Sequence, residues 1–187
     1  GTKMQKINFD KLTASQKTAV FHKDGPLLIL AGPGSGKTRV ITYRIAALID
    51  AGVSPHNICA ITFTNKAAQQ MLDRVIDLGT AHGAHISTFH SLCVRLLRQY
   101  GSAISIKSNF SIYDTTDQKR AIKDAVKQCQ LDTANFPPAR MLDAISTLKN
   151  KLIDEKTFAQ DAEDFFSKNL SRLYSKYQSI LKENNAM

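Results

Sequence analysis

The chain has 187 residues, of which 43% are apolar and 22% are charged, with nine glycines. This composition supports a normal hydrophobic core and excludes disordered, collagen-like and disulfide-stapled proteins, while the length favours one domain with at most an appended subdomain. The formal net charge is +9, which favours an anionic partner. Residues 1–100 carry +7 of this excess and residues 101–187 carry +2, so we expect a polyanion site in the N-terminal part.

The three cysteines, Cys59, Cys93 and Cys129, do not follow the spacing of a zinc site or a disulfide framework. We expect them to be buried thiols in a reducing compartment. No apolar run reaches the length of about 18 residues that a membrane span needs, and the first residues lack the apolar segment of a signal peptide. These features predict a cytoplasmic protein with no membrane partner. Residues 1–3 resemble a remnant of an expression vector, so Met4 is the expected native start.

The first hundred residues alternate short apolar runs with longer stretches of helical period, the pattern of a parallel sheet covered by helices. The run at residues 27–31 is continuously apolar, which predicts a strand buried on both faces. Further strands are expected at residues 58–63 and 85–88. In such an α/β sheet, ligands bind at the carboxyl ends of the strands. A helix is expected after each strand, over residues 37–51, 67–78 and 92–100.

Strand patterns disappear after about residue 112, and helical periods remain, broken at Pro137-Pro138. Thr115-x-x-Gln118 matches a capping box, so the first of these helices is expected to start there. The sequence thus predicts an α/β part over residues 1–111 and an all-helical subdomain over residues 112–187. Further helices are expected over residues 141–152, as a short helix with Phe158, Phe165 and Phe166, and over residues 170–181.

The segment Ala31-Gly-Pro-Gly-Ser-Gly-Lys-Thr38 lies between the first expected strand and the first long helix, where a phosphate-binding loop belongs. Its alternative is a flexible glycine turn. Lys37 would place a cation on the β and γ phosphates of ATP, and the Thr38 hydroxyl would complete a Mg²⁺ shell. Because Ala31 stands at the first motif position, only the relaxed form of the motif is met. The backbone amides that can point at phosphate oxygens belong to Gly34, Ser35, Gly36, Lys37 and Thr38.

Gln16 has two interpretations that the residues alone leave open. It is the last residue of Thr13-Ala-Ser-Gln16, a capping box in which its side chain can bind the Thr13 backbone amide. The same amide can also present one donor and one acceptor to an adenine edge.

Four blocks of the sequence resemble those of superfamily 1A DNA helicases of the UvrD, Rep and PcrA type, and they follow one another in the same order as in that family. The resemblance continues through Phe110–Asp114, which is similar to the start of the family's inserted helical subdomain 1B, and weakens after residue 118. It implies an incomplete P-loop (RecA-like) parallel sheet with flanking helices in residues 1–111, as part of ATP-binding lobe 1A, and a truncated subdomain 1B in residues 112–187. The blocks are Leu12–Val20, like the Q motif, Ala31–Arg39, like motif I, Ile61–Ala68, like motif Ia, and Thr88–Ser91, like motif Ib.

The resemblance also implies roles for single residues. Gln16 would read adenine, Gly34 to Thr38 would hold the phosphates with Mg²⁺, and Arg39 would lie beside the nucleotide, with Lys37 and Thr38 as the catalytic pair. An aromatic ring for base stacking and polar groups for phosphates suit single-stranded DNA. The residues that would meet that DNA are Phe63, Thr64, Asn65, Lys66, Thr88 and His90. From the residues alone, Phe63 can instead be the last core residue of its strand, Lys66 a solvated lysine and His90 a capping histidine.

The function implied by the resemblance is an ATP-dependent DNA helicase that moves 3′ to 5′ on single-stranded DNA and opens duplex at single-strand/double-strand junctions. Repair, replication restart and recombination all stay open as pathways. The chain has no apolar strand ending in Asp-Glu, and family members carry this Walker B block and their arginine fingers in later segments. We therefore expect an N-terminal fragment that is catalytically inactive alone.

Three alternatives remain at this point. The helicase subunit of a helicase-nuclease would use the same motifs. A P-loop kinase of small molecules would use the same loop, but it would not explain the aromatic and basic block at residues 63–66. A non-catalytic DNA-binding module fits the charge, but it leaves Lys37 and Thr38 without a purpose.

Overall fold

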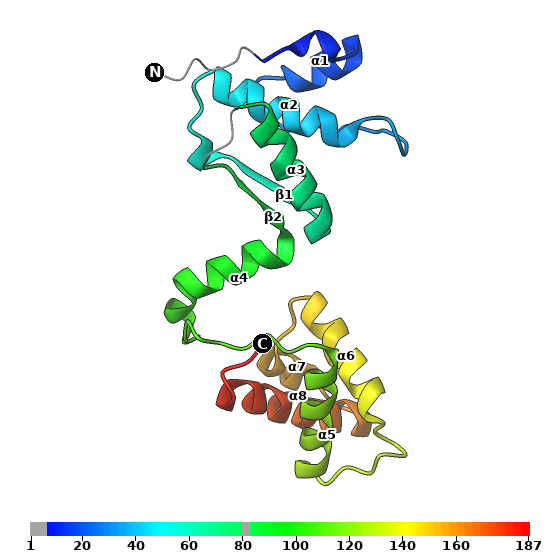
Figure 1. Cartoon of the computed structure of the whole chain (residues 1–187). Coiled ribbons are helices and arrows are strands. Elements are labelled where there is room, and N and C mark those ends of the chain that lie inside the picture. Colours follow the sequence, from blue (N-terminus) through cyan, green and yellow to red (C-terminus); the bar gives the residue numbers. More distant parts are fainter. Residues whose placement is uncertain (1–6, 80–82) are drawn as a thin grey trace. The chain divides into compact units, whose positions relative to one another are not determined.

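The computed structural model of the chain describes residues 7–79 and 83–187 (Figure 1). The chain forms two compact units, residues 1–95 and residues 96–187. The subdomain boundary expected between residues 111 and 112 stays a prediction. Within the described ranges, the helices are too short or too polar to cross a membrane.

The first unit combines short helices with a pair of strands. Single-turn 3-10 helices lie at Phe9–Lys11 and Pro55–Asn57. The last helix, α4, begins in this unit and ends in the second. The elements are α1 (Ala14–Val20), α2 (Lys37–Asp50), β1 (Cys59–Thr62), α3 (Asn65–Asp77), β2 (His85–Thr88) and α4 (Phe89–Tyr100).

The two strands pair in parallel, with Cys59 opposite His85 and Thr62 opposite Thr88. Helix α3 packs against both strands, and α2 packs against α3. This arrangement confirms the second and third strands and the three long helices expected from the sequence. The buried residues that join these elements are Ile45, Ile58, Ala60, Met71 and Val75.

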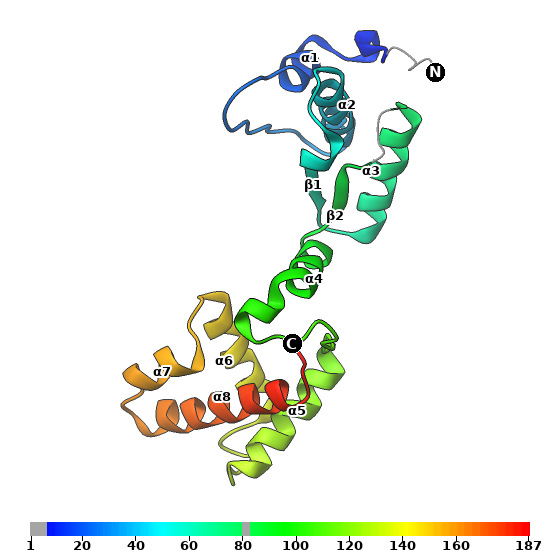
Figure 2. The same cartoon turned by 90° about the vertical axis from the view of Figure 1, so that its left-hand side faces the viewer.

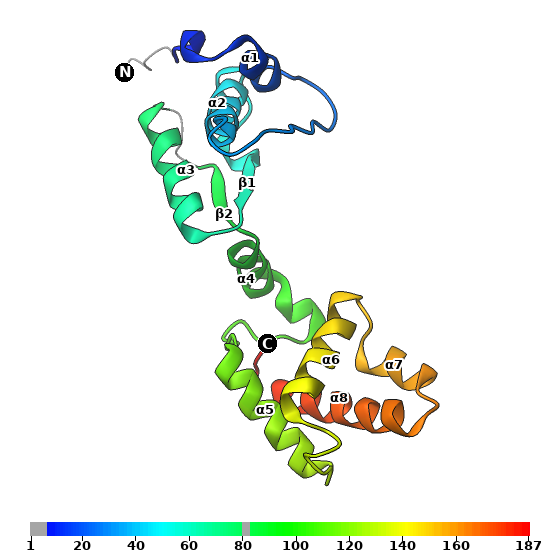
Figure 3. The same ribbon diagram turned by 90° about the vertical axis from the view of Figure 1, so that its right-hand side faces the viewer.

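The expected strand at residues 27–31 is wrong. In this range the chain forms neither helix nor strand, and it lies in the long loop that connects α1 to α2 (Figures 2 and 3). Leu28 and Leu30 are 83% and 88% exposed, the opposite of burial on both faces. A strand is stable only with a neighbour that accepts its backbone hydrogen bonds, and β1 and β2 pair with each other but not with this segment. The α/β class is therefore confirmed with two strands, and the RecA-like sheet stays a prediction.

Helix α1 is short and is fixed by its ends and by one buried face. The Thr13 hydroxyl accepts from the Gln16 backbone amide at 3.3 Å, and the Gln16 side-chain oxygen accepts from the Thr13 backbone amide at 3.0 Å. These two bonds confirm the capping box. Its apolar face packs against α2, where Leu12, Val20 and Val40 form a small buried cluster.

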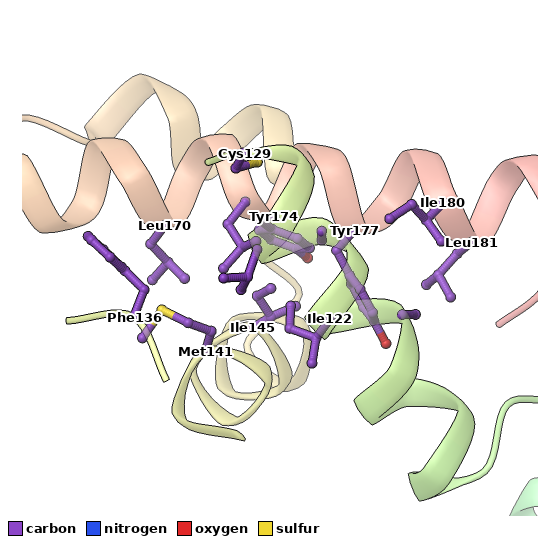
Figure 4. Packing of buried hydrophobic residues seen from close by; sticks show 14 residues of the cluster. Ile122, Cys129, Phe136, Met141, Ile145, Leu170, Tyr174, Tyr177, Ile180 and Leu181 are labelled. Carbon is purple, nitrogen blue, oxygen red and sulfur yellow. The ribbon is translucent and has the colours of Figure 1, made fainter. Parts of the chain in front are cut away.

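The second unit is all helical, apart from the single backbone bridge between Ser111 and Ala186. Helix α5 packs against both α6 and α8, and α7 packs against α8. Their facing sides form one contiguous core, in which Met141, Leu173 and Tyr174 are at most 2% exposed (Figure 4). The elements are a 3-10 turn at Gly101–Ile104, α5 (Thr115–Gln128), α6 (Pro138–Asn150), α7 (Glu155–Asp161) and α8 (Phe165–Glu183).

The helix starts of the second unit differ from the expected ones, most clearly at α5 and α8. Helix α5 is capped by Asp114, which exchanges hydrogen bonds with Asp117, and the expected Thr115 box is wrong by one residue. A carboxylate is at least as good a cap as a hydroxyl, so the earlier residue takes the role. Phe165 and Phe166 do not share a short helix with Phe158, because Asp164 caps α8 just before them.

The expectation of three buried cysteines is also wrong. Cys59 and Cys93 are exposed, and only Cys129 is buried. Cys59 begins the strand β1 and points away from the buried side that Ala60 occupies, as the alternation of a strand requires. Burial raises the pKa of the Cys129 thiol.

Candidate nucleotide and nucleic-acid site

The loop before α2 leaves the positive end of this helix open. Gly36 is the N-cap, with a φ of 83°, and no side chain caps the first amides. The first turn of α2 also carries no acidic residue. Gly34 has a φ of 74°, so both glycines occupy the left-handed region that other residues disfavour. A helix start with free amides and no negative charge is suited to an anion.

Cations surround this helix start. A cavity of about 300 Å³ is lined by the continuous segment from Gly34 to Arg39 and by Arg74 of α3, without a carboxylate. Lys37 Nζ lies over the loop, donating to the Ala31 carbonyl at 2.8 Å and to the Gly32 carbonyl at 3.1 Å. The residues present therefore fit a group of phosphates.

A divalent cation has fewer ligands of its own here. The Ser35 and Thr38 hydroxyls are the neutral side-chain oxygens of the cavity that suit Mg²⁺. Over the described ranges, no group of three or more His, Cys, Asp or Glu side chains is arranged to hold a metal. Magnesium fits this site only as a partner of bound phosphates.

A second cavity of about 420 Å³ adjoins the first, since Gly36, Arg39 and Arg74 line both. The Arg39 guanidinium lies 5.8 Å from the centre of the Tyr43 ring. Tyr43 and Asp77 also line this space. Sequence reasoning placed Arg39 beside the nucleotide but missed Arg74, because only the packing of α3 on α2 brings Arg74 to the loop.

Gln16 performs its capping role and also reaches the loop. While its Oε1 accepts from Thr13, its Nε2 donates to the Ser35 carbonyl at 3.5 Å. A Cβ placed on Gly36 would lie 2.9 Å from Gln16 Nε2. These two bonds use one lone pair and one N–H of the amide, so one acceptor and one donor remain available to a ligand.

The carboxyl ends of β1 and β2 form a separate aromatic edge. Because Thr62 lies opposite Thr88, the next residues, Phe63 and Phe89, emerge side by side, with ring centroids 6.1 Å apart. Phe63 is 91% exposed and Phe89 is 53% exposed. The alternative that Phe63 is a core residue is therefore wrong. Phe89 was missed by sequence reasoning, although the parallel register of the two strands indicates it.

The polar residues expected to meet DNA divide into two groups at this edge. Asn65, Lys66 and His90 are exposed. The Thr64 hydroxyl caps α3 by accepting from the Ala67 amide at 3.1 Å. Thr88 is only 6% exposed, and its hydroxyl accepts from the Ser91 amide and donates to the Ser91 hydroxyl. Thr88 therefore supports the first turn of α4, which leaves His90 without the capping role considered above.

Comparison with known proteins gives the family of this chain. Residues 12–187 match the UvrD/REP helicase N-terminal domain. The chain belongs to the UvrD/REP helicase family. Two relatives, both ATP-dependent DNA helicases PcrA, come from Staphylococcus aureus (strain Mu50) and Staphylococcus epidermidis (strain ATCC 12228), and each is 48% identical over 179 residues. The match covers 94% of this chain but 24% and 25% of these relatives, so the chain spans about a quarter of their length.

The UvrD/REP match covers every residue of both arrangements described above. It includes the loop at residues 31–38 and the edge formed by residues 63–66 and 88–90. The superfamily 1A resemblance seen in the sequence is thereby confirmed. The two arrangements are distinct in this UvrD/REP chain: a cation-lined helix start on α2, and an exposed aromatic pair where β1 and β2 end.

Proposed function

We propose that this chain is the ATP-binding N-terminal part of an ATP-dependent DNA helicase. The whole protein would couple ATP hydrolysis to 3′ to 5′ movement on single-stranded DNA and to opening of duplex at junctions. The observation that carries the proposal is the open N-terminus of α2, which is lined by the positively charged side chains of Lys37, Arg39 and Arg74. Family membership and the names of the PcrA relatives support the same function.

The triphosphate would bind on the amides of Gly34 to Thr38, with Lys37 on the β and γ phosphates. For this, Lys37 Nζ must exchange its two loop carbonyls for phosphate oxygens, which are stronger, charge-assisted acceptors. Bound Mg²⁺ would neutralise phosphate charge, and the Thr38 hydroxyl would be one of its ligands. Arg39 and Arg74 add two cations on the side of the neighbouring cavity.

Gln16 would select the base. Its amide has one acceptor and one donor left after its bonds to Thr13 and Ser35. Adenine presents the complementary pair, an N6–H₂ donor and an N7 acceptor. Guanine presents two acceptors on the same edge, O6 and N7, and would place one of them against the Gln16 oxygen.

Single-stranded DNA would bind at the carboxyl edge of β1 and β2. The exposed Phe63 ring offers a stacking platform for a base, and the neighbouring Phe89 ring widens it. Asn65, Lys66 and His90 provide polar groups for phosphates. The Thr64 and Thr88 hydroxyls would act on DNA mainly by fixing the first turns of α3 and α4.

Catalysis needs more than these groups. Lys37 and Thr38 hold phosphate and metal in both ground and transition states, and equal binding of the two gives no acceleration. No carboxylate lines the phosphate cavity, and no apolar strand of the sequence ends in Asp-Glu. An arginine finger alone contributes a factor of about 10³ to 10⁵ in rate. We therefore expect the 187-residue chain to bind nucleotide weakly and to hydrolyse it negligibly.

The test is steady-state ATP hydrolysis with and without single-stranded DNA, by the 187-residue chain and by the full-length protein. The expected result is DNA-stimulated turnover by the full-length protein, abolished by Lys37→Ala, and none by the chain. A full-length protein that ignores DNA, or that transfers phosphate to a small molecule instead of water, would overturn the helicase proposal. Comparable turnover by the short chain would overturn the account of the missing groups.

A further inference from the structure

Arg44, in the middle of α2, reaches across to the C-terminal end of α1. Its Nη1 donates to the carbonyls of Ala19 at 2.9 Å, Val20 at 3.3 Å and His22 at 2.7 Å. The last carbonyls of a helix lack partners within the helix, and the helix dipole is negative there. One guanidinium therefore satisfies these carbonyls, opposes the dipole and ties the end of α1 to α2.

Helix α1 depends on such attachments. It has seven residues, and isolated helices of fewer than about 12 residues are marginal in water. Another attachment is the small buried cluster of Leu12, Val20 and Val40. Arg44 adds a directional restraint to this apolar contact, because the two N–H groups of Nη1, shared among three carbonyls, hold the end of α1 against α2.

Gln16 lies on the same short helix, one turn before Ala19 and Val20. Its bond to the Ser35 carbonyl is 3.5 Å long, at the limit of a hydrogen bond, and its Nε2 is already close to Gly36. A small shift of α1 in one direction breaks this bond, and a shift in the other brings the amide into the loop. The position of α1 therefore decides whether the Gln16 amide faces a bound base correctly.

We propose that Arg44 is a positioning residue for base selection. By clamping α1 to α2, it holds the Gln16 amide at the phosphate loop and so sets the preference of the site for adenine over guanine nucleotides. The inference rests on the proposed function, because it takes the loop as an ATP site and Gln16 as the group that reads the base. Arg44 itself contacts backbone carbonyls and no nucleotide.

The test compares dissociation constants of fluorescent Mg-ATP and Mg-GTP analogues for the 187-residue chain. A good bidentate contact to a base discriminates by a factor of about 5 to 150. Arg44→Met keeps the side-chain length but removes the donors, and should reduce the ATP-over-GTP preference to the value found for Gln16→Ala. GTP affinity should change little. Arg44→Lys, which keeps the charge but reaches fewer carbonyls, should lie between the two.

The double variant Gln16→Ala/Arg44→Met separates positioning from general damage to the fold. If Arg44 acts through Gln16, it adds nothing further to the preference once Gln16 is gone. Arg140→Met, which removes an exposed arginine from α6, is the matched control and should keep the wild-type preference.

The outcomes distinguish this inference from the proposed function. A wild-type preference in Arg44→Met, or a further change of preference in the double variant, overturns the role of Arg44. An unchanged preference in Gln16→Ala overturns base reading, and the role of Arg44 with it. Unchanged binding of both nucleotides to Lys37→Ala would instead contradict the proposed ATP site.

Discussion

The helices of the two units begin with different chemical groups. In the first unit the caps are uncharged: α1 and α3 begin at threonine hydroxyls, α2 begins at a glycine, and the first turn of α4 is held by another threonine hydroxyl. In the second unit α5, α7 and α8 all begin at aspartate carboxylates. The uncharged caps are Thr13, Gly36, Thr64 and Thr88, and the carboxylate caps are Asp114, Asp154 and Asp164.

This difference matches the ligand proposed for each region. A carboxylate at a helix start is stabilising, because it accepts amide hydrogen bonds and faces the positive end of the dipole. The same charge would repel a phosphate brought to that helix start. In the first unit, which carries the proposed nucleotide and DNA sites, no helix start bears a negative cap, and α2 is left open for an anion. In the second unit three helices use a carboxylate for their own stability, and α6 begins after Pro137 without a side-chain cap.

The hydrophobic cores of the two units also differ, and again the second unit has the features that favour stability. In the second unit one cluster of 14 buried residues joins α5, α6 and α8, whereas the described buried residues of the first unit form clusters of five and three. The first unit also exposes a run of four apolar residues, Leu27 to Leu30. We infer that the second unit is the more stable of the two in this chain.

The largest expected effect comes from matched core truncations. Met141 is fully buried in the large cluster and Met71 is 3% exposed in the smaller one. Met141→Ala should destabilise the second unit by about 2–5 kcal/mol, and Met71→Ala should cost less, near the lower end of that range, because a smaller cluster collapses more easily. Amide hydrogen exchange in each unit gives the two free energies. A larger loss for Met71→Ala would reverse the order of stability inferred here.

The sequence predicted local structure well wherever one segment carried the whole signal. The helical period and the glycine stop gave α2, and the boundaries of β2 were predicted residue for residue. The strand at residues 27–31 failed because a continuous apolar run indicates burial but does not name the neighbouring strand that would bury it. For the caps, Asp114 and Thr115 are both good capping residues, so only the backbone decides between them.

For the candidate site, the sequence points to residues that lie within motifs, and the structure adds neighbours that only packing brings to them. Lys37 and Phe63 belong to local patterns and lie where a phosphate or a base can reach them. Arg74 and Arg44 belong to no local pattern for a nucleotide, since Arg74 reaches the loop only through the packing of α3, and Arg44 acts on a different helix. The burial of Thr88 could not be predicted from the sequence either, because a threonine at the end of a strand can face solvent or cap the next helix.

The next effect in size concerns the open helix start of α2. Lys37→Ala should weaken the binding of a fluorescent Mg-ATP analogue by about 1.5–3 kcal/mol, or roughly 10- to 150-fold, the range for a hydrogen bond to a charged group. Lys119→Ala, which removes an exposed lysine from α5, is the control and should bind like wild type. Equal affinities for wild type and Lys37→Ala would contradict the idea that the start of α2 lacks a charged cap in order to bind phosphates.

The aromatic edge should contribute a similar or smaller effect on DNA binding. Phe63→Ala should weaken binding to oligo-dT by about 1–3 kcal/mol, the value of one base stacked on an aromatic ring, with little change in salt dependence. Lys66→Ala should instead lower the slope of log affinity against log salt by about 0.7, the value for one phosphate of a single strand. Fluorescence anisotropy at several salt concentrations measures both. If both variants follow the wild-type line, DNA contacts a different surface.

The smallest effect is the pH dependence that the carboxylate caps give to the second unit. The Ser167 hydroxyl and amide lower the pKa of Asp164, and the backbone amides of Asp117 and Thr157 lower the pKa values of Asp114 and Asp154. A carboxyl with a lower pKa when folded adds stability above its unfolded pKa of about 4, and this stability is lost as pH falls through the folded pKa. The uncharged caps of the first unit add no such dependence.

Replacing the three carboxylate caps by asparagine tests this last difference. Asparagine caps a helix about as well as aspartate but does not titrate. Between pH 7 and pH 3, amide exchange should therefore show a smaller loss of stability in the second unit of the triple variant than in wild type. Asp143→Asn, which removes an exposed carboxylate from within α6, should keep the wild-type profile. Parallel profiles for wild type and the triple variant would mean that the carboxylate caps do not distinguish the acid stability of the two units.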